Sequence, residues 1–220
     1  MNTISNQRTT DPATEPATVS EVDKFLRGDE VLESVDGDLI ESLITAAREY
    51  VEEYTRRALI TQTWTMFMDA FPQVQDPLGW WDGVREGSIT MGQARAFELP
   101  IGPLQSVTQI STFDDDNTET VFAASNYFLN TTKTPGEVIL NTGVTWPVFT
   151  RNRNGIKVEY VAGYGDLATD VPSALRTAVK MMATHWYENR EFTKTQSDMN
   201  QAPAPIHIQS ILNRYRVKKL

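Results

Sequence analysis

The side chains most able to bind a metal are few and scattered. Residues 114–116 form a run of three aspartates. An EF-hand loop needs alternating acids, a central glycine and a closing glutamate about 12 residues on, and these are missing. His185 and Glu188 have the spacing of a ligand pair on a helix, but the other histidine, His207, lies far along the chain. We therefore predict a solvated turn at 114–116, a packed or hydrogen-bonded His185, and no metal site.

Residues with catalytic potential are equally isolated. Residues 163–165 read Gly-Tyr-Gly, but a phosphate loop needs a third glycine or a Gly-Lys-Ser/Thr ending, and Asp166 would repel a phosphate. A turn that takes the chain from a strand to a helix is the better interpretation. The chain has no cysteine and no G-x-S-x-G motif, and Glu52 and Glu53 are helix neighbours that do not face each other. We expect neither an enzyme nor a bound cofactor.

Composition and charge exclude further classes. The chain has 220 residues, with 20 basic and 29 acidic side chains and a net charge of −9. Its first 55 residues hold 13 of the acids and four of the bases, so the whole excess lies there. A surface that grips DNA or an anionic membrane needs clustered Lys and Arg. No stretch approaches the roughly 18 apolar residues that span a bilayer. We expect a soluble protein, made in the cytoplasm, without membrane contact.

The periodicity of apolar residues predicts an α+β fold. Helices are expected near residues 18–27, 38–56 and 170–190, because apolar residues recur there every three or four positions. Thr18 and Glu21 form a capping-box pattern at the start of the first. Between the helices, residues 60–165 alternate and carry turn residues, which predicts an inserted antiparallel β unit. The whole is a small helical bundle with a β insertion.

The ends of the chain have a different character from its middle. Residues 1–17 are polar and are expected to form a flexible tail, before a main domain at 18–190. Residues 191–205 read as a linker. Residues 206–220 combine apolar and basic side chains, which favours docking on a partner over packing on their own domain. The candidate docking residues are Ile206, Ile208, Ile211, Leu212, Arg214, Tyr215 and Arg216.

Two adjacent tryptophans, Trp80 and Trp81, lie in a predicted loop between residues 73 and 92. Adjacent exposed tryptophans often mark an interaction surface. The alternative is that one or both fold back onto the β unit, and the sequence favours neither interpretation.

Three segments resemble the head–tail connector (adaptor) family of long-tailed bacteriophages and related prophages. They cover residues 38–55 with 57–64, residues 99–107, and residues 158–165 with 171–176 and 187–190. Together they extend from about residue 20 to residue 190, which makes 18–190 the connector domain. Each segment alone is moderately specific, and their order and spacing are more so.

The resemblance implies a structural virion protein. Members of that family form a homo-oligomeric ring, commonly of about twelve subunits, beneath the portal protein at one capsid vertex. The ring extends the channel for viral DNA, which passes without specific binding, and offers a platform for the next neck or tail-completion protein. The implied location is the neck of the virion, between capsid and tail. A helical bundle is the family fold, and the long middle section here implies its β-bearing variety.

An acidic channel wall would repel the phosphate backbone and let DNA slide. We therefore take Glu49, Glu52 and Glu53 as candidate channel-facing acids. Two alternatives remain open. One is a tail-completion or other neck protein that binds the tail rather than the portal. The other is a hydrolase or carbohydrate-binding module that uses the β unit as its ligand platform.

Overall fold

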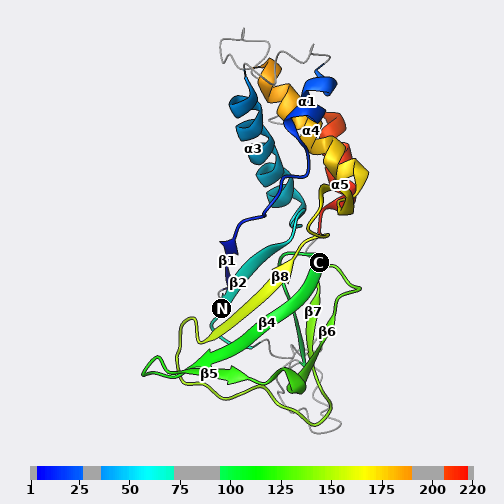
Figure 1. The fold of residues 1–220 in the computed structure, drawn as a ribbon. Helices are drawn as coiled ribbons and strands as arrows, with labels where there is room; N and C mark the ends of the chain where they lie inside the picture. The colour runs from blue at the N-terminus through cyan, green and yellow to red at the C-terminus, as the bar shows by residue number, and fades with distance from the viewer. Residues whose placement is uncertain (1–3, 27–35, 72–94, 190–205, 218–220) are drawn as a thin grey trace, which may run out of the picture. The chain divides into compact units, whose positions relative to one another are not determined.

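The computed structural model describes residues 4–26, 36–71, 95–189 and 206–217 (Figure 1). The chain divides into two compact units, which confirms the predicted α+β class. The β unit comprises Met1–Thr10, Thr63–Pro100 and Leu104–Val161, and the helical unit comprises Asp11–Gln62, Ile101–Pro103 and Ala162–Leu220.

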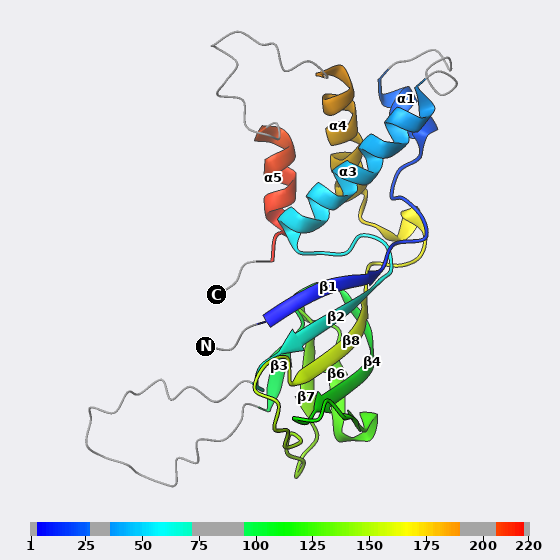
Figure 2. The same ribbon diagram turned by 90° about the vertical axis from the view of Figure 1, so that its left-hand side faces the viewer.

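The helical unit is built around α4, which packs against three other helices (Figure 2). The helices are α1 (Val19–Phe25), α3 (Gly37–Thr55), α4 (Ser173–Glu188) and α5 (Ile206–Tyr215), with a 3₁₀ turn at Ala168–Asp170. Fully buried apolar side chains of α3 and α4, among them Ile44, Val51, Leu175 and Met182, form its core. Most of the apolar residues at helical spacing therefore face inward, whereas Leu39 of α3 is 38% exposed.

Two helix starts illustrate how far local sequence decides structure. The predicted capping box is present: Thr18 Oγ1 accepts from Glu21 N at 3.2 Å, and Glu21 Oε2 accepts from Thr18 N at 3.3 Å. Helix α3 instead begins after Asp36, not at the expected Asp38. The Asp36 carboxylate makes no capping hydrogen bond to the helix and accepts one from the Tyr187 hydroxyl at 2.6 Å.

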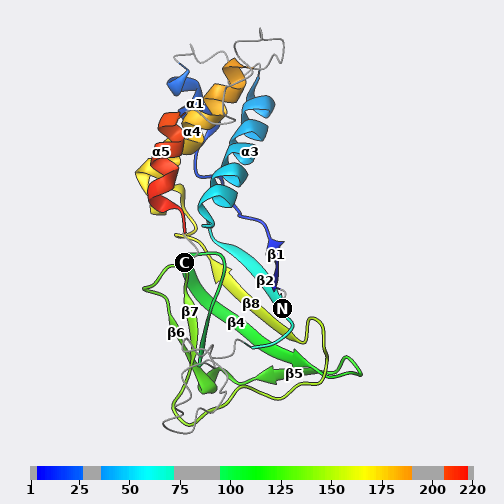
Figure 3. The same cartoon turned by 180° about the vertical axis from the view of Figure 1, so that it is seen from behind.

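The β unit contains two sheets (Figures 1 and 3). The five-stranded sheet has the order β1-β2-β8-β4-β5, and the three-stranded sheet has the order β3-β7-β6. The strands are β1 (Ile4–Thr10), β2 (Gln62–Met68), β3 (Ala96–Glu98), β4 (Leu104–Phe113), β5 (Glu119–Phe122), β6 (Tyr127–Asn130), β7 (Glu137–Leu140) and β8 (Ile156–Ala162). A 3₁₀ turn, Ala124–Asn126, precedes β6.

An aromatic cluster fills the interior of the β unit. Trp146 is 3% exposed and stacks on Phe71, with ring centroids 4.4 Å apart and planes 8° apart. Phe97 and Phe122 also lie against the Trp146 ring, at centroid distances of 5.4 and 5.9 Å. Each such aromatic pair stabilises the fold by about 0.5–1.5 kcal/mol, in addition to the free energy gained by burying the ring surfaces.

The first residues of the chain correct one prediction. The sequence predicts a flexible tail over residues 1–17, but Ile4–Thr10 forms strand β1, which pairs antiparallel with β2. This strand is an edge held mainly by main-chain hydrogen bonds, so its side chains can be polar and give no apolar alternation to read. A register irregularity between Arg8 and Thr10 further obscures the pattern.

Candidate functional site

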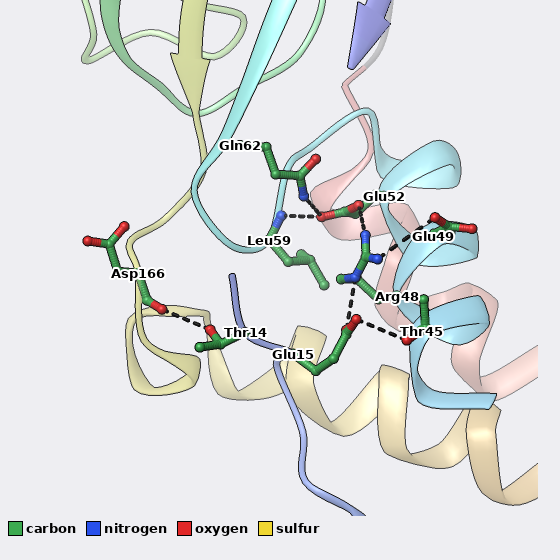
Figure 4. A network of polar contacts seen from close by, with 9 residues as sticks. All are labelled: Thr14, Glu15, Thr45, Arg48, Glu49, Glu52, Leu59, Gln62 and Asp166. Atoms are coloured by element: carbon green, nitrogen blue, oxygen red, sulfur yellow. Dashed lines mark hydrogen bonds and ion pairs between the residues drawn. The ribbon is translucent and has the colours of Figure 1, made fainter. Parts of the chain in front are cut away.

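The most elaborate polar arrangement in the helical unit is an ionic network around Arg48 (Figure 4). Arg48 projects from α3, and its side chain is 3% exposed. Its Nε donates to Glu15 Oε2 and its Nη1 donates to Glu52 Oε2, each at 2.9 Å. Glu15 also accepts from Thr45 Oγ1 at 3.0 Å. One buried guanidinium thus joins the segment before α1 to helix α3.

Glu52 extends this network toward the start of β2. Its Oε1 accepts from the main-chain N–H of Leu59 at 2.8 Å and from Gln62 Nε2 at 2.6 Å. The carboxylate is therefore bonded on both oxygens although the residue is 8% exposed. Helix α3 ends at its C-cap residue Arg56, which has a left-handed backbone conformation with φ 57°. Glu52 holds the turn that follows the helix.

Burial and neighbouring charges have opposite effects on the pKa values of Glu52 and Arg48. Burial raises the pKa of Glu52, and the hydrogen bond from Leu59 and the nearby Arg48 offset only part of that effect. For Arg48, burial lowers the pKa, but the attraction of Glu52 and Glu15 outweighs it and the net pKa is raised. Arg48 therefore stays charged. The arrangement is suited to holding structure rather than to chemistry.

The predicted channel-facing acids do not share one environment. Glu52 is wrong as a channel residue, because its carboxylate is buried in the network around Arg48. Glu49 and Glu53, on the same helix, are exposed. Helical spacing explains the difference, since residues 52 and 53 point about 100° apart. Glu49 lies 3.8 Å from Arg48 Nη2 with half of its side chain exposed.

The predicted docking segment packs on its own unit. Ile208 and Leu212 are fully buried in the helical core, so the prediction that they face a partner is wrong for the packed helix. The C-terminal end of α5 is tied down as well: Arg57 Nε donates to Tyr215 O at 2.6 Å and Val217 N donates to Thr55 O at 3.0 Å. An apolar stripe on a short terminal helix has the same signature whether it covers its own core or a partner.

The remaining docking candidates lie mostly outside that core. Arg214 and Arg216 are exposed, and Ile211 and Tyr215 are half-buried. The Arg216 guanidinium lies over the Tyr54 ring, 5.2 Å from its centroid. The side chain of Ile206, and Trp80 and Trp81, lie outside the described residues.

Three further motifs have the structural roles expected of them. Asp114 Oδ1 accepts from the main-chain N–H groups of Asp116 and Thr118, so the acidic run closes the β4–β5 hairpin. Gly163 has φ 146° and donates to Pro103 O at 2.9 Å, as the glycine turn requires. His185 lies against the side chain of Asn189, with its Nδ1 3.2 Å from Nδ2. Among the described residues, no three His, Asp or Glu gather as metal ligands.

Sequence reasoning missed a set of exposed apolar side chains. Val148 is 94% exposed, although it lies between Trp146, which is buried, and Phe149, which packs on Phe71. Thr150 of the same loop accepts from Asp115 N at 3.0 Å. The loop is therefore pinned while Val148 projects from it. The others are Phe25, Leu39 and Leu167 in the helical unit and Val121 and Phe128 in the β unit. Apolar residues in loops and short strands carry no periodic signal that separates exposed from buried positions.

Within the residues that the structure describes, no helix has the length and apolar character of a membrane span. The described residues of the two units thus offer packed cores, a buried ionic network and a set of exposed apolar side chains.

Comparison with known proteins identifies the family. The model of the head completion protein family (HCP) matches residues 17–218, and the chain belongs to that family. This confirms the resemblance to the head–tail connector (adaptor) family of phages. No curated protein matches the sequence significantly.

Solved structures with the same fold come from a phage-like particle. A chain of the neck of the empty GTA particle, computed with C6 symmetry, is 20% identical with a TM-score of 0.72, and the match covers 98% of this chain and 97% of that one. A chain of the native gene transfer agent (GTA) virion is 21% identical with a TM-score of 0.69, covering 98% and 96%. A chain of the native GTA neck, computed with C12 symmetry, is 21% identical with a TM-score of 0.59, covering 96% and 97%.

Proposed function

We propose that this protein is a structural component of the neck of a tailed, phage-like virion. Copies of the chain form a ring beneath the portal at one capsid vertex, extend the DNA channel and offer a platform for the tail. The observation that carries this proposal is the family match over residues 17–218, combined with a fold likeness to neck chains that spans nearly the whole length of both partners.

A ring is supported by symmetry and by surface. The neck chains with this fold lie in particles computed with C6 or C12 symmetry. A subunit of a closed ring contacts its two neighbours through different faces, so it needs apolar surface beyond its own core. Val121, Phe128 and Val148 in the β unit and Phe25, Leu39 and Leu167 in the helical unit are such surface.

Binding to the portal is the direct test of this role. Purified chain mixed with purified portal rings is expected to co-assemble in a fixed ring stoichiometry, measured by native mass spectrometry and by electron microscopy of the neck. We place the contact at the basic end of α5, so Arg214→Glu is expected to weaken it several-fold. Lys24→Glu, at another exposed base in the helical unit, is the matched control.

Reversal of Arg214 is a better test than deletion of residues 206–220, because deletion would also remove Ile208 and Leu212 from the core. No association with the portal would contradict the proposed position. Association with purified tails instead would identify the chain as a tail-completion protein.

The exposed acids of α3 give a second test. We propose that Glu49 and Glu53 line the channel, so the double variant Glu49→Lys/Glu53→Lys is expected to slow DNA ejection from assembled particles, since lysines on the wall attract phosphate. The delay should shrink at high salt. Ejection kinetics followed by dye release measure it.

The matched control makes the same change in net charge at two acids outside α3. Asp115→Lys/Asp116→Lys alters two exposed acids at the β4–β5 hairpin of the other unit. Ejection at the normal rate from Glu49→Lys/Glu53→Lys particles would place these acids outside the channel.

A further inference from the structure

In the described part of the chain, the five-stranded sheet has an open edge on each side. The sheet ends at β1 on one side and at β5 on the other, and no described strand pairs with the outer edge of either (Figure 1). An open strand edge presents unpaired N–H and C=O groups that another strand can complete. Natural proteins blunt such edges with charged residues, proline, β-bulges or very short strands. Lysine and proline are absent from β1 and β5, and Ile4 to Arg8 pair with β2 without a bulge.

The outward main-chain groups of β5 can be assigned from the hairpin. Asp114 N donates to Thr118 O at 3.3 Å, which makes these two residues a hydrogen-bonded pair. Because such pairs alternate along an antiparallel ladder, the main-chain groups of Thr120, opposite Thr112, face β4. Those of Glu119 and Val121 therefore face outward from the sheet.

The edge of β1 is regular over most of its length. Ile4 to Arg8 pair in unbroken register with Met68 to Trp64, and the irregularity follows only after Arg8. Arg8 is the charged residue of β1, and Glu119 is the charged residue of β5. The carboxylate of Glu119 is already paired within its own sheet, 3.7 Å from Lys157 Nζ, so the two edges offer main-chain groups rather than a charge pair.

We propose that β5 of one copy pairs with β1 of the next copy, so that the five-stranded sheets join around the ring. The proposal rests on the proposed ring, and it identifies the contact between neighbouring copies that closes the ring. Heterologous closure requires two different surfaces that fit each other, and two open edges of one sheet meet that requirement. Val121, 58% exposed beside its outward N–H, becomes covered by the neighbouring copy.

The side chains that would meet lie on one face of the sheet. Asn6 accepts from the hydroxyl of the buried Tyr160, and Phe122 packs against Tyr127, so both belong to the inner face. Successive side chains of a strand alternate between faces. Ser5 and Gln7 on β1 and Val121 on β5 therefore lie on the outer face, whereas Thr120 lies on the inner one.

Cysteine pairs test the contact without background, because the chain has no cysteine. Ser5→Cys/Val121→Cys and Gln7→Cys/Val121→Cys are expected to give disulfide-linked ladders between copies in assembled rings, read on non-reducing gels. Ser5→Cys/Thr120→Cys, whose cysteines lie on opposite faces, is expected to give none. Ring formation itself is read separately by mass. Rings that form without either ladder would overturn the β1–β5 contact while leaving the proposed function intact.

A proline variant tests the same contact without cross-linking. Val121→Pro removes one outward N–H and spares the β4–β5 ladder, so the monomer should keep its circular dichroism and thermal midpoint while ring assembly weakens about tenfold. Val121→Thr keeps the N–H and the branched side chain and should assemble normally. Normal assembly of a folded Val121→Pro protein would overturn the proposal. So would equally efficient dimers of Val121→Cys alone, which would indicate β5–β5 pairing.

Discussion

Replacing Arg48 by methionine is expected to lower the free energy of unfolding of the helical unit by about 3–5 kcal/mol. The substitution leaves the Glu52 carboxylate, which is 8% exposed, without its cation. Glu15, at 25% side-chain exposure, can turn to water and costs little. Denaturant unfolding followed by helical circular dichroism measures the loss.

A double variant separates the effect of the unpaired charge from the effect of lost hydrogen bonds in the network. Glu52 also accepts from Leu59 N and from Gln62, and a glutamine at position 52 keeps an oxygen for both. Arg48→Met/Glu52→Gln is therefore expected to be more stable than Arg48→Met alone, although it carries one more substitution. Glu49→Ala, on the exposed side of the same helix, should cost less than about 1 kcal/mol. A loss below about 1 kcal/mol for Arg48→Met would contradict the account of the network.

Replacing Gly163 by alanine is expected to cost about 3–5 kcal/mol, from strain at positive φ together with overpacking. A Cβ at this position would lie 2.6 Å from Thr61 N and 2.7 Å from the carbonyl group of Ile60. These are main-chain atoms, held by the bonds from Thr61 N to Gly165 O and from Tyr164 N to Leu59 O. They cannot move aside as a side chain can.

Gly143→Ala is the matched control for strain alone. Gly143 also has a positive φ, 81°, but a Cβ there meets nothing within 4 Å. Its cost should stay near 1 kcal/mol. Thermal unfolding of both variants would compare them, and equal losses would show that the close main-chain approach at Gly163 adds nothing.

The parts of the fold that were predictable are those with a local signal. The α3 stripe, the Thr18–Glu21 capping box and the β4–β5 hairpin follow from spacing and turn chemistry within a few residues. Strand β1 was not predictable, because its partner is about 60 residues away and its side chains are polar. Local patterns do not carry information on a main-chain pairing of that separation.

The same limit explains the outcome for the candidate sites. Spacing placed Glu49, Glu52 and Glu53 on one helix, but only the fold brings Leu59 N and Gln62 to Glu52 and so distinguishes it from its neighbours. For α5, an apolar stripe is visible in the sequence but its packing partner is not, and the stripe packs into the core of the helical unit. The exposure of Val121 and Val148 could be recognised only from the structure, because the sequence does not distinguish them from buried apolar residues.

The pinned loop around Val148 makes this side chain a preorganised anchor. Its neighbours are already immobilised by Phe71 and by Asp115 N, so covering Val148 freezes little additional backbone. A molecule that closes over it would retain most of the roughly 1.5–3 kcal/mol that burial of such a side chain releases. In a flexible loop, the entropy lost on ordering the loop would offset much of that gain.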